Sequence, residues 1–273
     1  MRLINQHPGR AEKIILGALP FVLLATAYAI GSNIRLSENP QDKLLPSLTQ
    51  MANTFYSYAF VPDKRSGDYL LWGDTAASLG RLLTGVAISA CIAVALGVPA
   101  GFIPRARAAL APFVAAISLI PPITVLPILF IIFGLGEASK IALIIVGTAP
   151  VMTRYLAQVV TEIPQEQIVK AVTLGASTWQ MVVRVVLPQI MPRLITCIRL
   201  GLAPAWIFLI SAEAIASTDG LGYRIFLVRR YLAMDVILPY VAWITLIAFT
   251  LDRLLYLYSK RRHPWAHIEG GAL

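Results

Sequence analysis

Long apolar stretches separated by short polar segments dominate this sequence. About six of them carry little charge over most of their length, at approximately residues 14–31, 76–103, 109–133, 141–160, 191–213 and 236–258. A membrane-spanning helix needs about 20 apolar residues to cross a hydrocarbon layer about 30 Å thick. The pattern therefore predicts an all-α integral membrane protein with about six transmembrane helices. We expect one transmembrane domain over residues 1–273, with its core at about residues 76–258.

Composition supports a lipid environment for most of the chain. Hydrophobic residues make up 58% of it and charged residues 14%, whereas soluble domains have about 25% charged residues. The net charge of +9 could indicate nucleic acid, but the basic residues lie mostly at the ends of the apolar stretches. Membrane topology explains that placement better than nucleic-acid binding. The Lys260–Arg262 cluster also suits contact with anionic lipid headgroups.

The short Pro104–Ala108 turn and the Lys260–Arg262 cluster decide the predicted orientation, because short basic connections stay on the cytoplasmic side. We expect both termini to be cytoplasmic and residues 32–74 to be extracytoplasmic. Within that segment, Leu44–Phe60 has apolar residues at helical spacing, with Pro46 in its first turn. This pattern predicts a helix lying on the outer membrane surface.

The first apolar stretch has two interpretations. Ile14 to Ala29 follows a basic lead-in and ends in Ala27-Tyr28-Ala29, which is compatible with a cleaved signal peptide. Its length and Pro20 favour a retained helix instead. The predicted orientation of the later stretches is the same in both cases.

The connection between the fourth and fifth stretches is amphipathic and long. Pro164 can open a first helix, and Gly175 can end it in a turn with positive φ. Ser177 can then cap a second helix over Thr178–Leu187, which we expect Pro188 to end. Two helices joined by a glycine turn would form a compact protrusion that suits docking into a groove on a soluble partner. A hairpin lying on the inner leaflet without a partner is the alternative.

The sequence predicts no metal site and no disulfide. His263 and His267 are four residues apart, but Pro264 between them argues against a helix that presents both rings to one metal. Cys91 and Cys197 lie in separate apolar stretches, where buried unreactive thiols are expected.

The loop at residues 162–188 resembles the EAA loop of ABC importer permeases. Val169–Gly175, nine further residues and then Val185–Pro188 reproduce that spacing, although Val169 and Lys170 stand where the family has Glu and Ala. Glu166, one turn earlier, can replace the missing glutamate. The residues that the resemblance assigns to the coupling loop are Glu166, Val169, Lys170, Ala171, Gly175, Ala176, Ser177, Leu187 and Pro188.

Further fragments look like the nitrate, sulfonate and taurine importer permeases, over roughly Ser78 to Trp265. They include Pro121-Pro122-Ile123, Phe133–Lys140 and Gly220-Leu221-Gly222. The resemblance implies a non-enzymatic permease subunit of the bacterial inner membrane that imports a small anion by alternating access. It also implies a second copy of the permease, a cytoplasmic ABC ATPase dimer and a periplasmic substrate-binding protein. The chain has no phosphate-binding Gly-x-x-x-x-Gly-Lys motif, so ATP and magnesium are expected on the ATPase. A secondary transporter and an integral membrane enzyme are the alternatives.

Polar residues within apolar stretches are candidates for a translocation pathway, because charge is costly there. The candidates are Arg81, Pro121, Pro122, Arg199, Trp206, Ser211 and Glu213. For Arg199 and Glu213 a structural ion pair and a role in the pathway are both open. Arg81 is either a snorkelling anchor or a contact for an entering anion, and Trp206 either lines the pathway or packs in the bundle.

Overall fold

The computed structural model describes residues 9–39, 42–64 and 67–267, which form helices and their connections without any strand. The helices are α1 (Arg10–Glu38), α2 (Leu48–Phe60), α3 (Leu70–Phe102), α4 (Pro104–Ile117), α5 (Pro122–Phe133), α6 (Glu137–Thr161), α7 (Gln165–Thr173), α8 (Thr178–Met181), α9 (Leu187–Ala216), α10 (Leu221–Arg229) and α11 (Met234–Arg262), together with a π-helical turn, Val182–Val186, and a 3₁₀ turn, Pro264–His267. The prediction of an all-α fold is confirmed.

The number of membrane-spanning helices agrees with the sequence. Five helical segments are long and apolar enough to span a membrane, and the bent pair α4 and α5 can supply a sixth crossing. That pair differs from the prediction of one span over residues 109–133. The two helices meet at 94°, because Pro121 and Pro122 follow the end of α4 and start a new helix rather than extending the old one.

The described chain divides into two compact units. The first contains α1, α2 and residues 228–241. In this unit the Tyr28 hydroxyl donates to the Pro46 carbonyl at 2.7 Å, and Thr54 donates to Asp235 at 3.1 Å. The α2 helix begins at Leu48, capped by Ser47, so Pro46 precedes it and the predicted start at Leu44 is too early.

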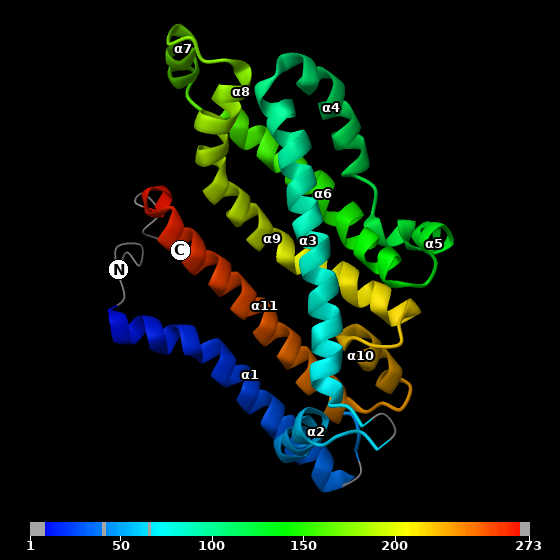
Figure 1. The fold of residues 1–273 in the computed structure, drawn as a ribbon. Helices are drawn as coiled ribbons and strands as arrows, with labels where there is room; N and C mark the ends of the chain where they lie inside the picture. Colours follow the sequence, from blue (N-terminus) through cyan, green and yellow to red (C-terminus); the bar gives the residue numbers. More distant parts are fainter. Residues whose placement is uncertain (1–8, 40–41, 65–66, 268–273) are drawn as a thin grey trace. The chain divides into compact units, whose positions relative to one another are not determined.

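The second unit contains residues 70–227 and 242–273. Helix α3 packs along α6, and α9 packs against both of them (Figure 1). Glycine allows the close approach of α3 to α6. A Cβ atom on Gly101 would lie 2.5 Å from Cβ of Val160, and one on Gly97 would lie 2.9 Å from the Thr153 carbonyl oxygen. These small residues therefore serve packing within the chain.

Two ends of this second unit carry the features relevant to function. Helices α7 and α8 lie at the same end as the connection between α3 and α4, whereas α10 lies at the opposite end, beside the start of α3 (Figure 1). A short bend at residues 217–220 connects α9 to α10.

Candidate functional site

The connection at residues 162–188 folds as a protruding helical knob. Pro164 precedes α7, and Glu166 lies in its first turn, where a carboxylate suits the helix dipole. Gly175 has a φ of 79° and turns the chain, because glycine adopts positive φ without steric cost. Ser177 then accepts from the Gln180 backbone N–H and caps α8. These features confirm the predicted helix, glycine turn and capped second helix.

The knob exposes large apolar side chains. Leu174 is 81% exposed and Trp179 is 74% exposed, and Val169 and Val172 of α7 are more than half exposed. Ala171 and Ala176 are joined instead through the backbone, since the Ala176 N–H donates to the Ala171 carbonyl. An apolar surface on an otherwise polar connection is typical of a protein-binding patch.

The second helix of the knob does not end at Pro188, and that part of the prediction is wrong. It passes through the π-helical turn directly into α9, forming one helical segment from Thr178 to Ala216. The Leu187 N–H donates to the carbonyl of Val182, five residues back. Proline lacks an N–H and its ring crowds the carbonyl four residues earlier, so the π-helical turn accommodates Pro188 without breaking the helix.

Gln189 joins the two helices of the knob. Its Nε2 donates to the Val185 carbonyl at 3.0 Å and to Oε1 of Gln167 in α7 at 2.8 Å. The first bond satisfies a carbonyl in the π-helical turn, and the second spans 22 positions in the sequence. A side-chain hydrogen bond thus links α7 to the first turn of α9.

A network of charged side chains lies at the other end of the second unit, centred on Arg81 of α3. The Arg81 guanidinium donates to Glu213 at 2.7 Å, to Glu137 at 2.5 and 2.8 Å, and to Asp219. Arg81 is 3% exposed and Glu213 is fully buried. Both carboxylate oxygens of Glu213 also accept from the Ser78 hydroxyl. The arginine is therefore buried and paired rather than extended toward a lipid headgroup.

Sequence analysis missed several members of this network. Asp74, which is 2% exposed, pairs with Arg224 at 2.8 Å, and it also accepts from the Gly220 N–H at 3.0 Å. Lys140 pairs with Glu137 at 2.9 Å. The available signal was the spacing of Asp74 and Arg81, seven residues apart and thus on one face of α3.

The remaining pathway candidates lie in separate places. Arg199 forms a bidentate ion pair with Asp252 of α11 at 2.8 and 3.0 Å, so neither Arg81 nor Glu213 is its partner. Trp206 is 4% exposed, and its Nε1 has no hydrogen-bond partner among the described residues. Ser211 is partly buried, and its hydroxyl donates to its own helix at the Ile207 carbonyl.

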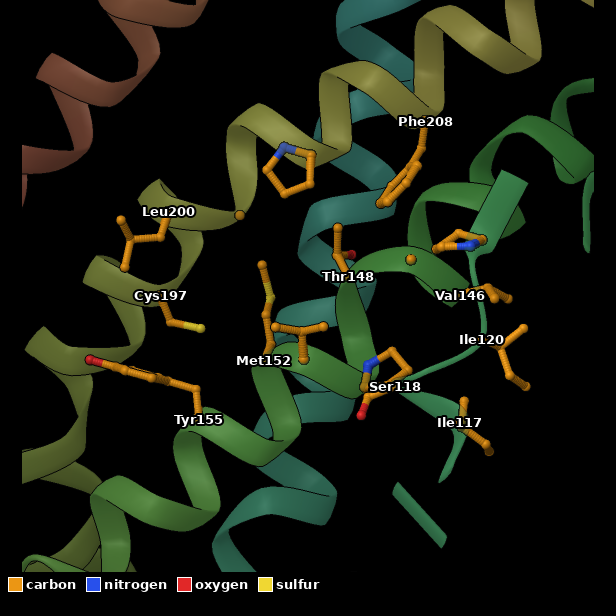
Figure 2. Close-up of a pocket in the computed structure, with 16 residues that line it drawn as sticks. Ile117, Ser118, Ile120, Val146, Thr148, Met152, Tyr155, Cys197, Leu200 and Phe208 are labelled. Carbon is orange, nitrogen blue, oxygen red and sulfur yellow. The ribbon is translucent and has the colours of Figure 1, made fainter. Parts of the chain in front are cut away.

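An apolar cavity of about 320 Å³ lies between α6, α9 and the α4–α5 connection. Tyr155 and Cys197 line one side of it, and Ile117 and Ile120 line the other (Figure 2). Pro122, a pathway candidate, is also part of the lining, but neither Arg81 nor Glu213 is. Within the described residues no group of three or more His, Cys, Asp or Glu side chains is placed to hold a metal ion.

Residues 92–263 match the family model described as the binding-protein-dependent transport system inner membrane component. The chain belongs to this family. The matched region covers more than half of the sequence and includes the whole helical knob. Membership places the protein among the permease components of ABC importers, in agreement with the resemblance noted in the sequence.

Two named relatives are similar over most of the chain. The taurine transport system permease protein TauC of Escherichia coli is 38% identical over 199 residues, which are 72% of each chain. The putative aliphatic sulfonates transport permease protein SsuC of Bacillus subtilis is 26% identical over 98% of this chain and 94% of its own length. A solved structure of the MetNI methionine ABC transporter, in an inward-facing conformation, gives a TM-score of 0.54 at 22% identity and covers 67% of this chain and 91% of that one. This structural likeness supports the shared fold.

Proposed function

We propose that the protein is the membrane-spanning subunit of an ATP-driven importer for a small organic sulfonate or a similar anion. The names of TauC and SsuC support this substrate class. In this proposal a periplasmic binding protein delivers the solute, and two copies of the permease pass it along their common axis by alternating access. ATP and magnesium bind to two cytoplasmic ATPase subunits and not to this chain. Family membership argues against a secondary transporter or a membrane enzyme.

The observation that carries the proposal is an apolar knob built onto a transmembrane helix. Leu174 and Trp179 are highly exposed, and the segment that holds Trp179 continues without a break into α9. In our proposal these side chains occupy a groove on the ATPase. Val169 and Lys170 replace the usual Glu and Ala of the family pattern, so we expect an apolar contact to supply much of the docking affinity.

In the proposed orientation, the knob and both chain termini lie on the cytoplasmic side of the bacterial inner membrane. The basic turn with Arg105 and Arg107 lies at the same end of the second unit as the knob, which supports this assignment. ATP-driven closure of the ATPases would draw the docked knobs together. The contact of Gln189 with Gln167 would then carry that movement into α9.

Docking can be tested with the permease and its ATPase co-expressed and purified through a tag on the permease. Trp179→Ser should lower ATPase recovery at least several-fold, because an exposed aromatic anchor carries a large share of interface energy. Trp265→Ser removes another tryptophan, 53% exposed, from outside the knob and should leave recovery unchanged. Equal recovery in the wild type and in Trp179→Ser would contradict the proposed docking surface.

Coupling requires a separate measurement in proteoliposomes with the binding protein present. Gly175→Pro should still insert but should lose substrate-stimulated ATPase activity, because proline cannot adopt the φ of 79° that the turn requires. Vanadate should abolish uptake by the wild-type complex. Uptake that is insensitive to vanadate, or normal coupled turnover in Gly175→Pro, would refute an ATP-driven mechanism acting through this loop.

A further inference from the structure

A second cavity, of about 400 Å³, lies between the end of α3, α4 and the last three turns of α6. Two arginines, Arg107 of α4 and Arg154 of α6, line it together with Gln158 and Thr161. No aspartate or glutamate belongs to the lining. In the part of the chain that the structure describes, neither guanidinium takes part in an ion pair. The cavity is therefore lined by two guanidinium groups that are exposed and have no carboxylate partner among the described residues.

Arg154 is unusual because its side chain is not directed to the nearest end of its helix. It lies seven residues before Thr161, the last residue of α6, or about 10 Å along the helix axis. An arginine that snorkels would extend toward that end. Its Nη1 instead donates to the Ser118 hydroxyl at 3.0 Å, and Ser118 follows the far end of α4. The guanidinium thus points away from the nearest aqueous boundary of the span.

Arg107 approaches the cavity from the opposite end of α4. Its Nε donates to the Ala100 carbonyl at 3.1 Å, and its Nη2 donates to the Gly101 carbonyl. These bonds satisfy carbonyls in the last turn of α3 and fix the guanidinium, while its Nη1 takes part in no hydrogen bond among the described residues. The two arginines therefore hold N–H donors at both ends of one cavity.

The basic cavity follows the apolar cavity along one face of α6. Gly147, Val151, Arg154 and Gln158 recur at the spacing of a single helical face. The first two line the apolar cavity and the last two line the basic one. Ser118 lines the apolar cavity and binds Arg154, so this hydrogen bond lies at the boundary between the two cavities.

Charged side chains in membrane spans usually face a partner or a water-filled route, and Arg154 has no carboxylate partner among the described residues. We propose that the basic cavity binds the oxyanion group of a ligand, a sulfonate or phosphate, at Arg154, while Arg107 adds positive charge from the other end of the cavity. A sulfonate solute in transit is the occupant if the proposed function holds, and the inference rests on that function to this extent. The phosphate of an anionic lipid offers the same chemistry and is the second source.

The test uses the full-length permease without its ATPase, in nanodiscs of zwitterionic phosphatidylcholine. Thermal stability is measured against increasing methanesulfonate, with chloride at the same ionic strength as the reference. The wild type should show a saturable stabilisation by methanesulfonate. Arg154→Gln should weaken the apparent affinity about tenfold or more, because it removes a charge-assisted hydrogen bond. Arg154→Lys keeps the charge and should retain part of the binding.

Arg105→Gln is the matched control, because Arg105 is exposed in the same turn as Arg107 but does not line the cavity. It should bind methanesulfonate as the wild type does. Replacing part of the phosphatidylcholine with phosphatidylglycerol distinguishes the sources. Stabilisation by this lipid that depends on Arg154 and removes the methanesulfonate effect identifies a lipid phosphate as the occupant.

Equal responses of the wild type, Arg154→Gln and Arg107→Gln to both methanesulfonate and phosphatidylglycerol would overturn the proposed site. Neither measurement involves ATP or transport. An anion-binding cavity in a protein that shows no ATP-driven uptake would therefore refute the proposed function and leave this site standing. ATP-driven uptake without any Arg154-dependent anion binding would support the proposed function and refute this site.

Discussion

The ion pair of Arg81 with Glu213 gives the most direct test of how this protein is held together. We consider Arg81→Met, which keeps much of the side-chain volume but removes the charge. Glu213 is fully buried, and Arg81 is its only ion-pair partner among the described residues. After the substitution, only the Ser78 hydroxyl and the Gly222 N–H would still donate to this carboxylate.

Removing one partner of a buried ion pair costs about 3–5 kcal/mol, because the other charge stays uncompensated. Glu137 and Asp219 are more than half exposed. Water can therefore replace most of their hydrogen bonds to Arg81, and their loss adds little to this free-energy estimate. For a domain of 150–250 residues, each kcal/mol shifts the melting temperature by about 2–4 °C. Arg81→Met should therefore melt on the order of 10 °C below the wild type.

The assay is thermal unfolding of the detergent-purified permease at neutral pH. Arg81→Met with Glu213→Gln should recover part of the loss, because the amide is neutral and still accepts hydrogen bonds. Arg230→Met, at an exposed arginine, should have little effect. If Arg81→Met keeps the wild-type melting temperature but abolishes anion uptake, our structural reasoning is refuted and Arg81 is a contact of the translocation pathway.

Three further predictions follow from individual contacts. Gln189→Ala should lower substrate-stimulated ATPase activity several-fold and leave basal activity unchanged, and Gln167→Ala should add nothing further in the double variant. Gln165→Ala removes an exposed glutamine of α7 that does not contact Gln189 and should behave as the wild type. Additive effects of the first two substitutions would contradict a shared contact. Gly101→Val should destabilise the protein by about 1–3 kcal/mol through overpacking of α3 against α6, which thermal unfolding would detect, and an unchanged melting temperature would argue against the close approach. Asp252→Asn should lower the free energy of unfolding by only about 1 kcal/mol, because its ion pair with Arg199 is partly exposed. A loss of stability as large as that of Arg81→Met would show that this pair is buried in the membrane.

The sequence was most informative where local chemistry determines structure. The turn at Gly175 and the cap at Ser177 depend on single residues and their neighbours, and both predictions are confirmed. The loop spacing that ends at Leu187 and Pro188 also indicated the family correctly. The prediction that Pro188 ends a helix was wrong, because local rules do not include the π-helical turn and the Gln189 contact that accommodate the proline.

Hydropathy alone determined that this chain is a multi-span helical membrane protein. The length of each apolar segment can be compared directly with the thickness of the hydrocarbon layer, without knowledge of any tertiary contact. The partners of its buried charges were decided only by the tertiary structure. Arg81 and Glu213 are 132 positions apart, and sequence spacing carries no information about contacts between different helices. The same limit applies to Arg154. Its place in a cavity without carboxylates appeared only when α4 and α6 were packed together.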